Sequence, residues 1–116
     1  MINWGIIGYG RMGKQFLQCF NNSKKNYKIL GIASKSNPKQ ILKNDLIIFS
    51  SYEELTNSKE IDAIYVSTTN QSHKEIVLKA ITQNKKILCE KPLGVNFQEV
   101  SEVHQALKNK KDNFFE

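Results

Sequence analysis

The sequence predicts an α/β fold, a doubly wound parallel sheet in a single domain over residues 1–116. Short apolar runs of strand length alternate along the chain with stretches whose apolar residues recur at helical spacing. The runs are apolar on both faces, which is typical of parallel strands covered by helices on both sides. With 40% apolar residues, the 116-residue chain can form one core. We therefore expect five or six strands.

The first half of the chain holds three of the expected strands: INWGIIG, YKILGIAS and LIIF (residues 2–8, 27–34 and 46–49). MGKQFLQCF predicts an amphipathic helix, because its apolar residues Met12, Phe16, Leu17 and Phe20 fall at helical spacing. NPKQILKN allows at most a short helix with Pro38 in its first turn. SYEELTNS predicts a helix that Ser50 or Ser51 caps, with Glu53 or Glu54 in its first turn.

The second half continues the alternation with the expected strands IDAIYVST and KILCE (residues 61–68 and 86–90). Between them, SHKEIVLKAITQNK predicts a helix whose buried face carries Ile76, Val77, Ala80 and Ile81. NFQEVSEVHQALKNKK (residues 96–111) predicts another helix, capped by Asn96, on which His104 is a surface residue. NFFE begins a further apolar run, which we expect to be a strand.

Composition excludes several classes of protein. The net charge of +6 comes mostly from lysines beside asparagine and serine, without interleaved aromatic residues, so we expect solvated lysines and no nucleic-acid partner. No run approaches the 18 apolar residues of a membrane span, and MINWGIIGYG lacks the basic start of a signal peptide. Cys19 and Cys89 form neither CxxC nor a metal-binding spacing. We therefore expect packed thiols, no metal and a reduced, cytoplasmic protein.

In a doubly wound sheet, ligands bind beyond the carboxyl ends of the strands. GYGRMG follows the first strand and opens a helix, so that Gly8, Gly10 and Gly13 form the dinucleotide fingerprint GxGxxG in its required context. The three glycines allow a tight turn, a close backbone approach to pyrophosphate, and close helix–strand packing. The alternative is a glycine-rich turn without a ligand. The expected cofactor-binding residues of this loop are Gly8, Tyr9, Gly10, Arg11, Met12 and Gly13.

The second strand end, ASKSNPK, bears on the choice of cofactor. NAD-preferring sites carry an acid about twenty residues past the fingerprint, where it binds the ribose 2′-OH. Here Ser34 and Lys35 stand in that region, and no acid appears between Gly31 and Lys43. A hydroxyl and an ammonium would bind a 2′-phosphate, so NADP is expected. NAD is the alternative, with Lys35 as a solvated loop lysine.

The last two strand ends carry polar residues as well. VSTTNQSH provides the short hydrogen-bonding side chains of Thr68, Thr69 and Asn70, and His73 is expected to cap the next helix or line the cofactor cleft. CEKPLG places Glu90, Lys91 and Pro92 where a buried strand should end. The residues alone leave two interpretations of this stretch. It is either a turn that aims a charge into a site or a strand-terminating turn with two solvated charges.

Taken together, these motifs resemble the glucose–fructose oxidoreductase / inositol dehydrogenase (Gfo/Idh/MocA) family. The resemblance rests on GxGxxG, YEELTNSKEIDAIYVST, TTNQSHKE and EKPLG, and it covers the whole chain as the NAD(P)-binding Rossmann domain, 1–116. One departure is Thr69, where family members usually have proline. The resemblance implies that Lys91 is the catalytic residue, close to the nicotinamide, where it polarises a carbonyl or stabilises an alkoxide. Glu90 would position Lys91, and Pro92 would fix the turn.

The resemblance also implies a second α/β domain, which supplies most of the substrate pocket and an acid/base histidine and which we expect to be absent here. The expected function is hydride transfer on a sugar or polyol in the full-length parent, a dehydrogenase. The alternative is an NADP-binding module or truncated remnant without activity. The expected partners are the sugar or polyol substrate of the parent, and either a second copy in a homo-oligomer or the missing C-terminal domain. Neither nucleic acid nor membrane is expected.

Overall fold

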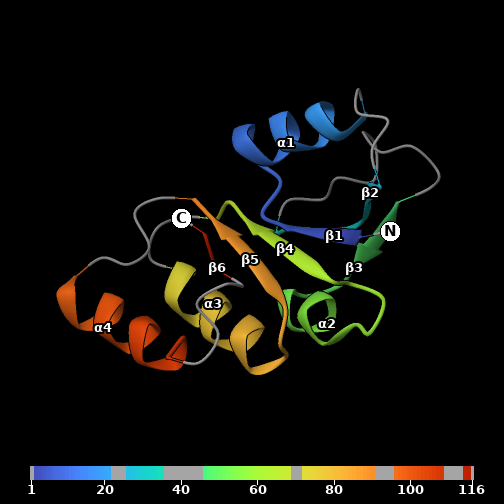
Figure 1. Ribbon diagram of the computed structural model, residues 1–116. Helices are drawn as coiled ribbons and strands as arrows, with labels where there is room; N and C mark the ends of the chain where they lie inside the picture. The colour runs from blue at the N-terminus through green and yellow to red at the C-terminus, as the bar shows by residue number, and fades with distance from the viewer. Residues whose placement is uncertain are drawn as a thin grey trace.

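The computed structural model of the chain describes residues 2–21, 26–35, 46–68, 72–90, 96–108 and 114–115. Its centre is one parallel sheet with the strand order β3-β2-β1-β4-β5-β6 (Figure 1). This is the order of a doubly wound dinucleotide-binding sheet, which confirms the predicted fold class. The strands are β1 Ile2–Ile7, β2 Tyr27–Ala33, β3 Ile47–Phe49, β4 Ala63–Val66, β5 Lys86–Cys89 and β6 Phe114–Phe115.

Helices cover both faces of the sheet. The helix α1 lies on one face, and the other three described helices lie on the opposite face (Figure 1). Because every pair of neighbouring strands is parallel, the carboxyl ends of all six strands lie at one edge of the sheet. The helices are α1 Arg11–Asn21, α2 Tyr52–Asn57, α3 His73–Thr82 and α4 Phe97–Ala106.

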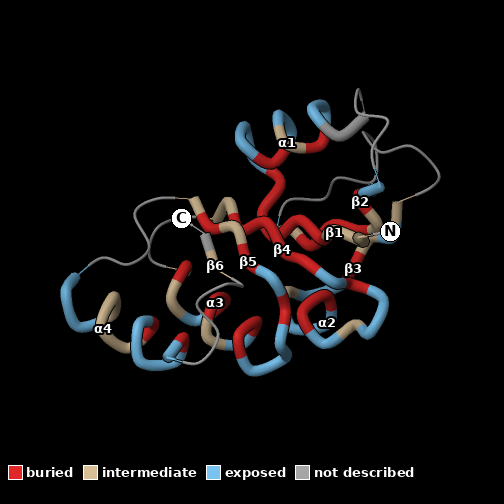
Figure 2. The backbone as a smooth tube through the Cα atoms, viewed as in Figure 1, coloured by how far each residue is buried: buried red, intermediate tan, exposed pale blue. Residues whose placement is uncertain are grey.

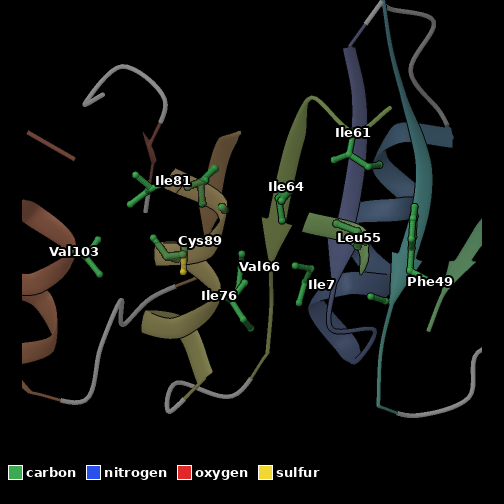
Figure 3. Close-up of a cluster of buried hydrophobic side chains, with 14 of the residues drawn as sticks. Ile7, Phe49, Leu55, Ile61, Ile64, Val66, Ile76, Ile81, Cys89 and Val103 are labelled. Carbon is green, nitrogen blue, oxygen red and sulfur yellow. The ribbon is translucent and has the colours of Figure 1, made fainter. Parts of the chain in front are cut away.

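The larger part of the core lies between the sheet and α2, α3 and α4. The strands contribute Ile64, Val66 and Ile87 to it, and α2 contributes the fully buried Leu55. Figure 3 shows Ile64, Val66 and Leu55 in this cluster. The predicted apolar face of α3 is confirmed, since Ile76, Val77, Ala80 and Ile81 are all buried here. Buried segments concentrate in the strands and on the inner sides of the helices (Figure 2).

A smaller cluster packs α1 onto the opposite face. The ring of Phe16 stacks on that of Tyr65, with centroids 4.0 Å apart and an interplanar angle of 10°. Trp4 meets Phe16 edge-on at 5.5 Å. Such aromatic pairs contribute about 0.5–1.5 kcal/mol each beyond their area burial. They fix the position of α1 above β1 and β4.

Both caps that the sequence predicts are present. The N–H of Glu54 donates to the Ser51 hydroxyl at 3.0 Å at the start of α2, and the N–H of Glu99 donates to the Asn96 side chain at 2.9 Å at the start of α4. Each cap stabilises its helix by about 1 kcal/mol. The carboxylate of Glu54 also accepts hydrogen bonds from the hydroxyl and the N–H of Ser50, which lower the pKa of that carboxyl.

Lys85 ties the end of α3 to the end of α2. The helix α3 closes with Asn84 at φ 58°, and the N–H groups of Asn84 and Lys85 donate to the Ile81 and Ala80 carbonyls. The buried side chain of Lys85 then reaches the carbonyls of Ser58, at 2.7 Å, and Ile61, at 2.6 Å. Burial lowers the pKa of this ammonium. The negative charge of Asp62 has a smaller effect in the opposite direction and raises that pKa.

Some local expectations were wrong. Met12 matches the helical spacing of apolar residues but does not join the core: it is 43% exposed at the first turn of α1, and its expected contact with the cofactor stays a prediction. Cys19 was expected to be packed, but it is exposed on α1, whereas Cys89 is buried. The helix expected over residues 96–111 ends earlier, at Ala106, where the Leu107 N–H closes the last turn on the Gln105 and Val103 carbonyls. NPKQILKN lies outside the described residues.

Candidate cofactor site

The candidate site lies at the carboxyl ends of β1, β2, β4 and β5. Gly8 follows β1, and its N–H donates to the Ala33 carbonyl at the end of β2, at 2.8 Å. Ser67 follows β4, and its N–H donates to the Ile7 carbonyl at 2.9 Å. Glu90 follows β5, and its N–H donates to the Val66 carbonyl at 2.9 Å. The hydrogen bonds of the sheet thus continue one residue past each strand and hold these ends together.

The three glycines of the fingerprint have different surroundings. Gly8 has φ +91°, a conformation that favours glycine, and a Cβ there would lie 2.9 Å from the Thr68 Cγ2. A Cβ on Gly13 would lie 2.5 Å from the Gly8 carbonyl oxygen, so α1 can approach β1 only with glycine at this position. A Cβ on Gly10 would meet nothing within 4 Å. Gly8 and Gly13 therefore shape the loop, while Gly10 faces open space.

The open space at Gly10 lies at the start of α1. The N–H of Lys14 donates to the Gly10 carbonyl at 3.0 Å, so the helix begins here, and its first N–H groups have no partner within the helix. No acidic residue lies in the first turn of α1. The backbone donors and the positive end of the helix are therefore available to an anion such as a pyrophosphate.

Tyr9 contributes differently from its neighbours in the loop. Its ring is buried in the cluster under α1, with the Lys14 ammonium 5.8 Å from the ring centroid. Only its main chain lies on the loop, where its N–H donates to the Ser34 hydroxyl at 3.4 Å. Ser34 therefore joins the end of β2 to the fingerprint, while Lys35, one residue further on, is exposed.

The end of β4 contains a contact that sequence reasoning missed. The Ser67 hydroxyl donates to the Gly8 carbonyl at 2.8 Å, the same oxygen against which Gly13 packs. Ser67 thereby fixes the loop from the neighbouring strand. A small hydroxyl directly after a strand, facing a glycine turn, is the only signal in the sequence that could have indicated this role.

His73 supports the same region from inside. It is the first residue of α3 and is fully buried, with its Nε2 2.9 Å from the Thr68 carbonyl oxygen. Because the ring is enclosed, it contacts the loop after β4 from within and does not line an open cleft. Thr68 is half-buried beside Gly8. Thr69 and Asn70 lie outside the described residues.

At the end of β5, the hydroxyl of Tyr65 donates to a carboxylate oxygen of Glu90. Burial, followed by this hydrogen bond and the charge of Glu90, raises the pKa of the Tyr65 phenol above its usual 10.0, so the hydroxyl stays a donor at neutral pH. Sequence reasoning assigned Glu90 to Lys91 and missed Tyr65. Lys91 and Pro92 lie outside the described residues, and their roles stay predictions.

Other features of the described chain lie away from this edge. An open pocket of about 520 Å³ is lined by residues such as Ile2, Asp62 and Lys86, at the beginnings of the strands and thus at the opposite edge of the sheet. Within the described ranges, no group of three His, Cys, Asp or Glu residues could hold a metal ion. No helix among them is long and apolar enough to cross a membrane.

Comparison with known proteins gives consistent matches over nearly the whole chain. Residues 2–116 match the Gfo/Idh/MocA family model, described as an oxidoreductase family with an NAD-binding Rossmann fold. A 2,7-anhydro-N-acetylneuraminate hydratase from Escherichia coli is 34% identical over 109 residues, which are 93% of this chain and 29% of that protein. A trans-1,2-dihydrobenzene-1,2-diol dehydrogenase from Bos taurus is 32% identical over 107 residues, 88% of this chain and 32% of that protein.

A solved structure shows the same arrangement of elements. The myo-inositol 2-dehydrogenase of Lactobacillus plantarum superposes with a TM-score of 0.87 at 25% identity, covering 98% of this chain and 35% of that one. The chain thus spans about a third of the length of the proteins that it matches.

Proposed function

Because the chain belongs to the Gfo/Idh/MocA oxidoreductase family, as its NAD-binding Rossmann domain, we propose that it binds NADP(H) along the carboxyl edge of its sheet. The observation that carries the proposal is the contrast among the three glycines. Two of them are required by close contacts to the chain itself, whereas Gly10 opens onto free space at the start of α1. Packing within the chain does not require glycine at position 10, but the lack of a side chain there allows the backbone to approach a pyrophosphate.

The residues around this space suit the parts of a dinucleotide. The first N–H groups of α1 would hold the pyrophosphate, and Ser34 and Lys35 at the end of β2 would hold the 2′-phosphate of the adenosine ribose. Ser67 and His73 support these contacts by fixing the Gly8 turn and the loop after β4. Thr68, Thr69 and Asn70 would meet the half of the cofactor that carries the nicotinamide.

We expect NADP(H) to bind at least several-fold more tightly than NAD(H), because Lys35 replaces the acid that would bind a ribose 2′-OH and repel a 2′-phosphate. Lys35→Ala should reduce this preference by about tenfold, the effect of one charge-assisted contact. Raising the salt concentration should reduce it as well, since charges at an exposed site are screened. Calorimetric titration with both nucleotides measures the preference.

The matched control for Lys35 is Lys59→Ala, which removes an equally exposed ammonium near the opposite edge of the sheet. It should leave both affinities unchanged. Equal affinities of the wild-type chain for the two nucleotides would show that Lys35 does not contact the cofactor.

For the whole protein, we propose hydride transfer on a sugar or polyol. A bound nicotinamide would supply the carbon that accepts or gives the hydride. Lys91, directly after Glu90, would hold the reacting oxygen of the substrate and stabilise negative charge on it. Names of relatives support this class of substrate: one matched protein is a diol dehydrogenase and another an inositol dehydrogenase.

Residues 1–116 alone are expected to show negligible dehydrogenase turnover. The reaction needs a group that exchanges the proton of the substrate hydroxyl. Of the two histidines of the chain, His73 is buried on the Thr68 carbonyl, and His104 is exposed on α4. Absorbance at 340 nm with NADP⁺ or NAD⁺ and a panel of inositols and hexoses measures the rate. Turnover of about 1 s⁻¹ or faster, as is typical of enzymes, would contradict this expectation.

We also propose a cytoplasmic location. Both cysteines are free thiols, and Cys19 is exposed on α1. An exposed free thiol is more common in compartments that keep thiols reduced.

A further inference from the structure

Tyr65 is a buried titratable residue, and it is not among the residues proposed to contact the dinucleotide. It lies in β4, is only 3% exposed, and points to the α1 face of the sheet. The cluster on that face is otherwise built from apolar and aromatic side chains, and phenylalanine would fill the same volume. The hydroxyl therefore needs a separate reason.

The position of that hydroxyl is tightly determined. The phenol ring stacks on Phe16 of α1, which Trp4 contacts edge-on in turn. In the register of the sheet, Tyr65 lies opposite Leu88, so Glu90, two residues further along the chain and directly after β5, lies on the same face. Side chains at this diagonal spacing can reach each other when they are long, and here the hydroxyl donates to the Glu90 carboxylate.

Glu90 is consequently attached to β4 twice. Its N–H donates to the Val66 carbonyl at 2.9 Å, and its carboxylate accepts the hydroxyl of the preceding β4 residue, Tyr65. Two attachments, one through the main chain and one through the side chain, fix both the position and the rotation of Glu90. The next residue in the chain is Lys91. The position and rotation of the residue that precedes Lys91 are therefore fixed.

We propose that Tyr65 is a positioning residue for Glu90 and, through it, for the lysine proposed to meet the substrate. It holds the Glu90 carboxylate on the α1 face of the sheet and so fixes the residue from which the chain leaves β5. The inference rests on the proposed function for the role of Lys91, and it adds a link between two parts of the site. Through the Phe16 stack, α1, whose start would hold the pyrophosphate, and Glu90 at the end of β5 share one support.

The hydroxyl can be removed without changing the packing by the substitution Tyr65→Phe. Affinity for NADPH should fall about three- to tenfold, the size of effect expected when a supporting contact of a binding site is lost. Affinity for 2′,5′-ADP, which lacks the nicotinamide half, should not change. A general loosening of the domain would lower the affinities for both ligands alike. The comparison therefore separates a positioning role from a merely structural one.

Tyr52→Phe is the matched control, because it removes a half-buried tyrosine hydroxyl on the opposite face of the sheet. It should leave both affinities unchanged. Calorimetric titration of the wild-type chain and the two variants with NADPH and with 2′,5′-ADP gives the comparison. If Tyr65→Phe lowers the affinities for both ligands equally, or leaves the affinity for NADPH unchanged, the proposal is overturned.

Amide hydrogen exchange tests the same proposal without a cofactor. In Tyr65→Phe, the Glu90 amide should exchange about tenfold faster, because one of two attachments of Glu90 is gone, while the amides of β1 stay protected. Unchanged exchange at Glu90 would overturn the positioning role. A wild-type chain that binds neither ligand would instead refute the proposed function, and hydrogen exchange would then decide on Tyr65 alone.

Discussion

Gly13→Ala is expected to destabilise the domain by about 3 kcal/mol and to abolish most of its cofactor affinity. The added methyl group would lie 2.5 Å from the Gly8 carbonyl oxygen and 3.2 Å from the Ser67 hydroxyl. The nearest neighbour is main chain, which cannot rotate away as a side chain can, so α1 must move from β1. Moving the helix displaces its first N–H groups, and the loss of one charge-assisted contact already weakens binding about ten- to hundredfold.

Gly10→Ala should separate binding from folding. A methyl group there meets nothing within 4 Å, and the φ of Gly10 lies outside the left-handed region, so the free energy of unfolding should stay the same or rise by up to about 1 kcal/mol. NADPH affinity should nevertheless fall at least about tenfold, because the methyl group occupies the space proposed for the pyrophosphate. Urea unfolding and calorimetric titration of both variants measure the two effects. Wild-type affinity in Gly10→Ala would contradict the proposed site.

Lys85→Met is expected to lower the free energy of unfolding by about 2–4 kcal/mol. The substitution keeps the length of the side chain but removes the donor that both the Ser58 and the Ile61 carbonyls use. These carbonyls lie where α2 ends and the chain enters β4. Losing their hydrogen bonds to Lys85 should therefore loosen this junction first.

The neighbouring Lys86→Met provides the control, since Lys86 is exposed on β5 and its replacement should change stability by less than about 0.5 kcal/mol. Urea unfolding followed by circular dichroism measures both variants. Similar midpoints for the two would show that water satisfies the Ser58 and Ile61 carbonyls in place of Lys85.

The elements of this fold follow from local patterns. Apolar runs and caps such as Ser51 and Asn96 determine where strands and helices lie, and the alternation of the two determines the parallel sheet. Exposure at the open edge could not be predicted in the same way. Met12 matches the helical spacing of buried residues, and only the fingerprint motif, not the spacing, indicated that it lies at the open edge, where it is exposed.

The candidate site was predicted at the level of motifs but not of contacts. The spacing of Gly8, Gly10 and Gly13 indicated the loop, and in the structure Gly8 and Gly13 shape that loop by close contacts, whereas its binding of a cofactor stays a prediction. The hydrogen bonds of Ser67 to Gly8 and of Tyr65 to Glu90 join residues 59 and 25 positions apart. Such contacts depend on the register of neighbouring strands, which no local pattern specifies.

The central position of β1 has a consequence for synthesis. β1 pairs with β2 on one side and with β4 on the other, and its contact between Asn3 and Asp62 spans 59 residues of the chain. At about 5–20 residues per second, a ribosome needs about 3–12 s to add that length. During this interval the nascent chain exposes one uncovered side of an apolar strand. An uncovered apolar strand edge of this kind is prone to pair with other chains, so we expect aggregation during synthesis to start there.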